Sequence, residues 1–149
     1  AVQDERARTA LWDFVQRGIA KGQALIAITW RKDPRDLPRL GSLLAAPAND
    51  PVAAGLYSLS YAMRNAYGDA ALPSLETALL KSGYVGVQTD CARELMLAGR
   101  PSGFAFAAQA IERKESYKQE MTQFVRDNFI EMRTVDEAAV LAFLKQRAK

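Results

Sequence analysis

The sequence predicts an all-α protein arranged as an α-α superhelix, a stack of antiparallel helix pairs with about seven or eight helices. The phrases DLPRLGSLL and ALPSLETALL begin 35 residues apart and share the pattern x-L-P-x-L. A second apolar segment with helical spacing follows each phrase. A degraded third copy is GRPSGFAFA, which begins at Gly99. Self-similarity at this period indicates an α-solenoid, in which stacking of neighbouring units supplies the core.

Length and composition fit one domain covering residues 1–149, because 49% hydrophobic and 25% charged residues are ordinary for a soluble globular chain. The 20 basic and 17 acidic residues give a net charge of +3 and are well interspersed. Such a weak field disfavours nucleic acid as the partner. No apolar run approaches the roughly 18 residues that a bilayer-spanning helix needs, so an integral membrane protein is not expected.

Chemical groups for catalysis are scarce. The chain has no histidine, the commonest general base and zinc ligand, and its only cysteine is Cys91. A thiol without a histidine partner lacks its normal activator, and we interpret Cys91 as a small buried residue on a helix. The sequence also lacks a phosphate-binding glycine loop, a C-x-x-C pair and an EF-hand loop. We therefore expect no catalytic residue, no metal and no cofactor.

The first two helices are predicted from their periodicity. Residues from Asp4 to Arg17 form an amphipathic helix that ends near Gly18. Its expected apolar stripe is Ala7, Leu11, Phe14 and Val15. A second apolar segment runs from Ala20 to Trp30 and ends before the Asp33-Pro34 turn.

The start of the chain leaves the compartment open. Ala1 is not a methionine, which fits either removal of a signal peptide or a fragment of a longer protein. The first alternative places the protein outside the cytoplasm, and a cytoplasmic location is equally compatible with the sequence.

The repeated phrases predict helix pairs. Pro38 and Pro73 each fall in a first helical turn, where the missing N–H costs nothing. The second helices of these units are expected at Val52 to Tyr67 and Val85 to Ala98. The apolar stripe of the former is Val52, Leu56, Leu59, Met63 and Ala66.

These runs resemble HEAT repeats, whose familiar phrase pairs an L-P-x-L helix with a second helix that ends in a leucine-glycine-acid turn. The resemblance covers about residues 21–129, and the chain departs from the usual D-x-x-V-R entry to the second helix, with DPVAAG in one copy and VGVQTD in the other. The resemblance implies that the second helix of each pair lines a concave surface. An unrelated helical bundle is the alternative that would give similar periodicities.

A candidate partner-binding ridge follows from that expectation. Tyr57, Tyr61 and Arg64 form a stripe turned by about 100° from the apolar one. Advancing the register to the next second helix places Arg93 at the position of Tyr61 and Met96 at that of Arg64. Aromatic and arginine side chains are favoured interface anchors, so Tyr57, Tyr61, Arg64 and Arg93 are the predicted site. In the alternative interpretation the tyrosines only pack against a neighbouring repeat.

The C-terminal part should close the stack. A charge-rich segment carries an interrupted apolar stripe of Tyr117, Met121, Phe124, Val125 and Ile130. Thr134 and Glu137 have the spacing of a capping box, which predicts a capping helix at about residues 135–147. Terminal units of solenoids must be polar outside, as the basic end of this helix is.

We therefore expect a noncatalytic protein-binding or scaffolding module that presents a concave helical surface to another protein. HEAT-like families also include bilin lyases and DNA alkylation-repair glycosylases, so an enzyme of either kind is the alternative. A glycosylase would need a strongly basic groove with aromatic residues, and the two tryptophans, Trp12 and Trp30, lie outside the best repeats. Trp12 is expected in the core.

Overall fold

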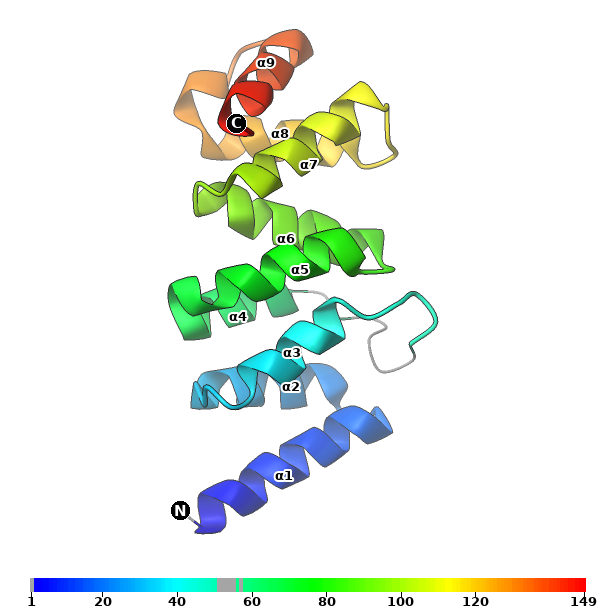
Figure 1. The fold of residues 1–149 in the computed structure, drawn as a ribbon, viewed down its shortest axis with the longest axis vertical. Helices are drawn as coiled ribbons and strands as arrows, with labels where there is room; N and C mark the ends of the chain where they lie inside the picture. The colour runs from blue at the N-terminus through cyan, green and yellow to red at the C-terminus, as the bar shows by residue number, and fades with distance from the viewer. Residues whose placement is uncertain (1, 51–55, 57) are drawn as a thin grey trace. The chain divides into compact units, whose positions relative to one another are not determined.

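The computed structural model describes residues 2–50, 56 and 58–149, and this part of the chain is all-helical (Figure 1). The described residues form nine α-helices, where the sequence predicts seven or eight, and no β-strand. The α-helices are α1 (Val2–Arg17), α2 (Lys21–Arg31), α3 (Leu37–Leu44), α4 (Leu59–Tyr67), α5 (Leu72–Lys81), α6 (Val85–Leu97), α7 (Pro101–Glu112), α8 (Lys118–Asn128) and α9 (Glu137–Arg147). Two short 3₁₀ helices are η1 (Gly68–Ala71) and η2 (Ile130–Met132). The predicted all-α class is confirmed.

Contacts divide the chain into two compact units, Ala1–Gln88 and Thr89–Lys149, with the boundary inside α6. Each unit buries its own apolar side chains. Fully buried residues of the first unit include Ile28, Leu40, Leu44, Met63 and Leu75. Those of the second unit include Leu95, Phe104, Met121, Val125 and Leu144.

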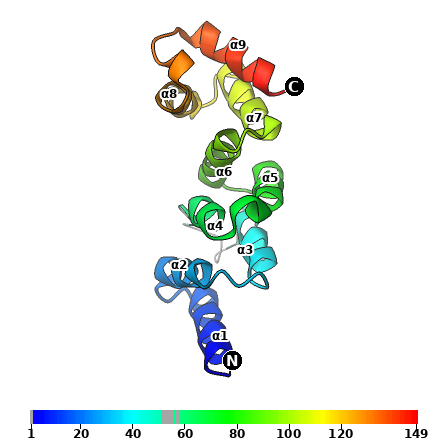
Figure 2. The same ribbon diagram turned by 90° about the vertical axis from the view of Figure 1, so that its left-hand side faces the viewer.

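The first unit has two layers of helices. α2 packs against α4 in one layer, and α3 packs against α5 in the other (Figure 2). α3 also contacts α4, which joins the layers, and α1 packs against α2. Each helix thus finds its main neighbours one or two places along the chain, which is how short amphipathic helices bury their apolar faces against one another.

The two L-P-x-L phrases begin helices as predicted. Pro38 lies in the first turn of α3 and Pro73 in the first turn of α5. An N–H group in this first turn would have no intrahelical partner, so proline, which lacks the N–H, fits there without cost. Gly18 follows the end of α1 with a φ of 68°, a backbone conformation that glycine adopts without steric cost.

The inward face of α1 matches the expected one in part. Val15 is buried and Leu11 is half-buried, as predicted, but Ala7 and Phe14 are exposed. Trp12, which is buried, and Arg8, which is half-buried, complete the inward face, because apolar spacing alone does not include hydrogen bonds to distant residues. Arg8 and Trp12 face inward because both of them donate hydrogen bonds to a buried carboxylate. The expectation that Trp12 is a core residue is confirmed.

That carboxylate belongs to Asp36, which is fully buried just before α3. Its Oδ1 accepts hydrogen bonds from Arg8 Nε at 2.7 Å and from Trp12 Nε1 at 2.8 Å. In the same turn the backbone carbonyl of Asp33 accepts a hydrogen bond from the Tyr67 hydroxyl at 3.1 Å. The turn between α2 and α3 is therefore bonded to α1 on one side and to the end of α4 on the other.

The predicted helix from Val52 to Tyr67 is observed only from Leu59 onward. Ser58 has a φ of 65°, and a left-handed residue cannot continue a right-handed helix. Val52 and Tyr57 lie outside the described residues. Within the described part of the predicted stripe, Leu56, Leu59 and Met63 are buried and Ala66 is half-buried.

In the second unit, α7 packs against both α8 and α9. Phe104 of α7 lies with ring centroids 5.8 Å from Phe129 and 6.1 Å from Phe143 of α9, and the latter two are 5.2 Å apart. Such tilted and edge-on pairs stabilise a core beyond the area they bury. This aromatic cluster joins the C-terminal helix to α7.

Two expectations for the C-terminal part are corrected. The N-cap of α9 is Asp136, whose side chain accepts a hydrogen bond from Ala139 N at 2.9 Å, so Thr134 is not the cap. Aspartate is as good a cap as threonine, and here it stands directly before the helix. Ile130 is exposed in η2, because the chain leaves α8 at Asn128 and the helical register ends there.

Leu75 and Leu80 give a matched test of the core, because both lie on α5 but Leu75 is fully buried and Leu80 is 81% exposed. Leu75→Ala should lower the free energy of unfolding by about 2–5 kcal/mol, through lost apolar burial and the remaining cavity. Leu80→Ala should change it by less than about 0.5 kcal/mol. Urea denaturation followed by circular dichroism measures both, and equal effects would contradict the packing described for α5.

Asp33 predicts an acid-sensitive contribution to stability. Hydrogen bonds from the Arg35 guanidinium are the largest of the causes that lower the pKa of Asp33 from 3.8 to about 2. A hydrogen bond from the Arg35 backbone N–H is the next largest. A carboxyl group whose pKa is lower in the folded state stabilises the fold at pH values above its unfolded-state pKa. This stabilisation is lost as the pH falls toward its folded-state pKa. The stability difference between the wild type and Asp33→Asn should therefore shrink as the pH falls from about 4 to about 2. Denaturant titrations at several pH values measure it, and a difference that stays constant contradicts this assignment.

Candidate functional site

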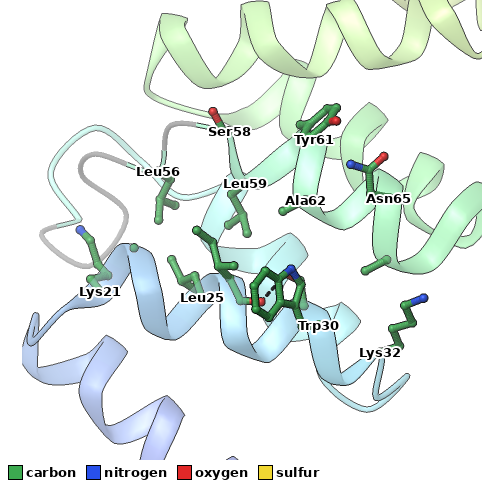
Figure 3. A pocket seen from close by; sticks show the side chains of 14 residues that line it. Lys21, Leu25, Trp30, Lys32, Leu56, Ser58, Leu59, Tyr61, Ala62 and Asn65 are labelled. Carbon is green, nitrogen blue, oxygen red and sulfur yellow. Dashed lines mark hydrogen bonds between the residues drawn. The ribbon is translucent and has the colours of Figure 1, made fainter.

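A pocket of about 450 Å³ lies in the first unit between α2 and α4 (Figure 3). Side chains from both helices and from the residues just before α4 converge on it. The described lining residues are Lys21, Gly22, Leu25, Ile26, Thr29, Trp30, Lys32, Leu56, Ser58, Leu59, Tyr61, Ala62, Asn65 and Ala66. The volume is in the range typical of ligand-binding pockets.

Helical periodicity explains why these residues share one surface. Gly22, Ile26 and Trp30 are spaced by four residues and therefore lie on one face of α2. Small residues keep the pocket open. A Cβ atom added to Gly22 would meet no other atom within 4 Å, and Ala62 and Ala66 present only methyl groups from α4.

The floor of the pocket is apolar and its edge carries large exposed side chains. Leu25, Leu56 and Leu59 are each buried. Trp30 is 79% exposed, Tyr61 58% and Ile26 46%. Single exposed apolar residues are normal on protein surfaces, but three of them around one apolar pocket make it a candidate contact site. We refer to Ile26, Trp30 and Tyr61 as the apolar rim.

The polar groups at this site are few. Among the described lining residues the charged ones are Lys21 and Lys32, at opposite ends of the pocket (Figure 3). The Thr29 hydroxyl already donates a hydrogen bond to the Ile26 carbonyl at 2.7 Å. The floor therefore favours apolar groups, while the two ends carry positive charge.

The predicted ridge is only partly represented at this pocket. Tyr61 lines it, whereas Tyr57 lies outside the described residues. Arg64 is half-buried on α4 and forms an ion pair with Asp69 at 3.0 Å, away from the lining set. Of the three predicted residues that the structure describes, Tyr61 lines the pocket and Arg64 and Arg93 do not.

Arg93 belongs to the second unit, where neighbouring groups hold its side chain. It forms ion pairs with Asp90 at 2.9 Å and with Glu120 at 3.3 Å. Its guanidinium lies 5.9 Å from the centroid of the Phe124 ring. Met96, expected on the same ridge, is instead buried, so it belongs to the core of this unit.

Sequence reasoning missed Trp30, Ile26 and the two lysines. A signal for the first two was present, because α2 buries Ala24, Leu25 and Ile28 and still has apolar residues at positions 26 and 30. A helix with apolar residues beyond its buried stripe has a face left for another surface. The pairing of α2 with α4, which completes the pocket, has no local signature.

No group of three or more histidine, cysteine, aspartate or glutamate side chains able to hold a metal ion occurs in the described part of the chain. Among the described helices, none is both long enough and apolar enough to span a membrane. The fourteen described residues around the pocket include no carboxylate and no thiol.

Cys91 is fully buried on α6, as its interpretation as a buried helical residue predicted. Burial, followed by the negative charges of Asp90 and Glu94, raises the pKa of its thiol to about 12. The thiolate is the reactive form of cysteine, so this side chain is chemically inert near neutral pH.

Comparison of the chain with models of protein families, with curated proteins and with solved structures finds no match. The resemblance to HEAT repeats therefore stays a prediction from the sequence pattern.

The burial of Cys91 predicts its reactivity. At pH 8 the native protein should react with dithionitrobenzoate at least about a hundredfold more slowly than the urea-unfolded chain, because the folded state hides the sulfur and disfavours the thiolate. The absorbance of the released thionitrobenzoate gives both rates. Equal rates would contradict the position of Cys91 in the core.

Proposed function

We propose that this protein is a noncatalytic protein-binding module and that the pocket between α2 and α4, which we call the groove from here on, is its contact surface. The observation that carries the proposal is the apolar rim. Ile26, Trp30 and Tyr61 stand exposed around a floor of buried leucines. Tryptophan and tyrosine at the centre of an interface typically supply most of its binding energy.

The proposal includes the finer architecture, a solenoid of HEAT-like helix pairs. The contacts in the first unit support it, because α2 packs on α4 and α3 on α5, so helices two places apart lie together. The second unit repeats this relation, with α7 packed on α8 and on α9. Stacked helix pairs have this pattern of neighbours, since equivalent helices of successive pairs form a layer.

The alternative is a HEAT-like enzyme, similar to a bilin lyase or to a DNA alkylation-repair glycosylase. General acid or base catalysis needs a titratable group within reach of the substrate. The described lining of the groove offers no carboxylate or thiol, and the chain has no histidine, so its titratable groups are the amines of Lys21 and Lys32 and the phenol of Tyr61. Two lysines are also far fewer positive charges than a glycosylase groove needs to follow a DNA backbone. These features favour binding over catalysis.

The contact surface we propose is therefore centred on the apolar rim, with Tyr61 retained from the predicted ridge. Arg64 neighbours it on α4 and stays in the proposal as a peripheral contact. Arg93 stays as a separate contact of the second unit, where its bonds to Asp90 and Glu120 already order the side chain. An ordered arginine loses less conformational entropy when a partner binds.

The test is an affinity capture from the native host with four forms of the chain. These forms are the wild type, Trp30→Ala/Tyr61→Ala, Gly22→Leu and Leu80→Ala. The double variant removes anchors that are largely exposed, so each change should cost folding no more than about 1 kcal/mol. Gly22→Leu should fill the groove without a clash and should favour the helix, because glycine is a poor helix former. Leu80→Ala is the matched control, an exposed apolar residue outside the pocket.

The expected result is a partner protein that the wild type and Leu80→Ala retain and that the other two variants lose. Circular dichroism melting must show that all four forms are folded. A partner retained by the double variant and by Gly22→Leu would contradict the groove as the contact surface. Arg93→Ala, measured in parallel, should weaken capture without lowering the melting temperature. Undiminished capture would remove Arg93 from the surface.

A further inference from the structure

We propose that the groove also binds a small molecule, an unbranched aliphatic acid whose carboxylate lies beside Lys32 and Asn65. Such a ligand goes beyond the proposed function, because it is not a protein. A volume of about 450 Å³ and an apolar floor are typical of sites that enclose small molecules. These sites also carry a few polar groups, which orient the ligand.

Two polar side chains lie at the end of the groove where α2 and α4 both end. Lys32 is the residue directly after α2, and Asn65 lies in the last turn of α4. The Tyr67 hydroxyl on α4 donates a hydrogen bond to the carbonyl of Asp33, the residue after Lys32. Lys32 and Asn65 therefore line the same end, away from Lys21 (Figure 3).

Both side chains are available to a ligand. Among the described residues, the Lys32 ammonium has no ion-pair partner and the Asn65 side-chain amide has no hydrogen-bond partner. Lys32 is exposed on a flexible stem, so its ammonium is free to turn toward the groove. Lys21 is not available in this way, because it already takes part in another interaction.

The number of free cations favours a carboxylate as the polar end of the ligand. The Lys32 ammonium and the Asn65 amide N–H groups offer donors to both oxygens of one carboxylate. A carboxylate carries one negative charge, which this one ammonium balances. A phosphate monoester carries a charge of about −1.5 to −2 at pH 7 and would need a second cation.

The rest of the groove fits an unbranched apolar chain. The row formed by Trp30, Ile26 and Gly22 extends over eight residues of α2, about 12 Å at a rise of 1.5 Å per residue. A Cβ atom added to Gly22 would meet no other atom within 4 Å, which leaves room for the end of the chain. Because burial of each methylene is favourable, the chain supplies affinity and the polar end supplies orientation.

The same floor disfavours an extended peptide. Its backbone N–H and carbonyl groups would lie against buried leucines without hydrogen-bond partners, whereas an aliphatic chain has no such groups. Trp30 of α2 and Tyr61 of α4 both border the groove and would cover the chain from their two helices (Figure 3). A bound acid would occupy the floor that a protein partner contacts, so acid and partner would exclude each other.

The experiment uses isothermal titration calorimetry with three probes of equal chain length, decanoate, decanol and decylamine, each kept below the concentration at which it forms micelles. A short acetylated peptide that ends in leucine with a free carboxylate is the fourth probe. The proteins are the wild type, Lys32→Gln, Lys32→Gln/Asn65→Ala, Gly22→Leu and Lys81→Gln. The last is the matched control, because it removes the same charge from α5, outside the groove. Melting temperatures confirm that all five proteins are folded.

Decanoate should bind the wild type most tightly and decylamine least. Lys32→Gln should weaken decanoate about threefold, the effect of one exposed ion pair, and leave decanol unchanged. Addition of Asn65→Ala should increase the loss of decanoate binding to about tenfold, since a hydrogen bond is lost as well. The preference for decanoate over decanol should shrink as salt is added. Gly22→Leu should abolish binding of all three, and Lys81→Gln should change none of them.

Three outcomes would overturn the inference without touching the proposed function. Equal binding of decanoate and decanol, unaffected by Lys32→Gln, would show that the groove does not recognise a carboxylate. Decanoate binding that survives Gly22→Leu would place the acid elsewhere on the protein. Absence of decanoate binding, while host capture depends on Trp30 and Tyr61, would leave the groove to a protein alone. Tighter binding of the leucine peptide than of decanoate would also overturn it, in favour of a partner's C-terminus.

Discussion

The buried carboxylate of Asp36 is the constraint on which the first unit depends. A charge removed from water is costly unless it is paired and hydrogen-bonded. Arg8 and Trp12 of α1 meet this requirement at one oxygen, while the other oxygen, Oδ2, is buried without a hydrogen-bond partner. The loss of either donor would leave the carboxylate still less compensated, and this fixes the rotation of α1. The site therefore selects one rotation of α1 against the rest of the first unit.

The same turn positions the groove. Because Tyr67 at the end of α4 donates to the Asp33 carbonyl, the turn that ends α2 is also joined to α4. The two helices that form the groove are thus connected through this hydrogen bond, which lies next to Lys32 in the sequence. Gly22 and Ala62, both small, line the groove itself.

Sequence periodicity predicted the helix starts, helix ends and buried residues that depend on neighbours close in the chain. The L-P-x-L helices, the end of α1 near Gly18 and the burial of Trp12 and Cys91 all follow from patterns within a few residues. The inward face of α1 depends on Asp36, 24 residues after Trp12, and no local pattern reports such a distant partner. The groove was missed for the same reason. Trp30 and Tyr61 come from helices that pair only through the tertiary fold.

The two tryptophans allow the most direct measurement of the central claim, that the α2–α4 groove is the contact surface for a partner protein. The indole N–H of Trp12 is bonded to Asp36 in the interior, whereas Trp30 is exposed at the groove. In ¹H–¹⁵N NMR spectra each indole gives one signal, and Trp30→Phe assigns them. Addition of the partner protein retained in the capture experiment should shift the Trp30 indole signal and leave that of Trp12 in place. A bound partner that leaves the Trp30 signal unchanged would contradict the claim.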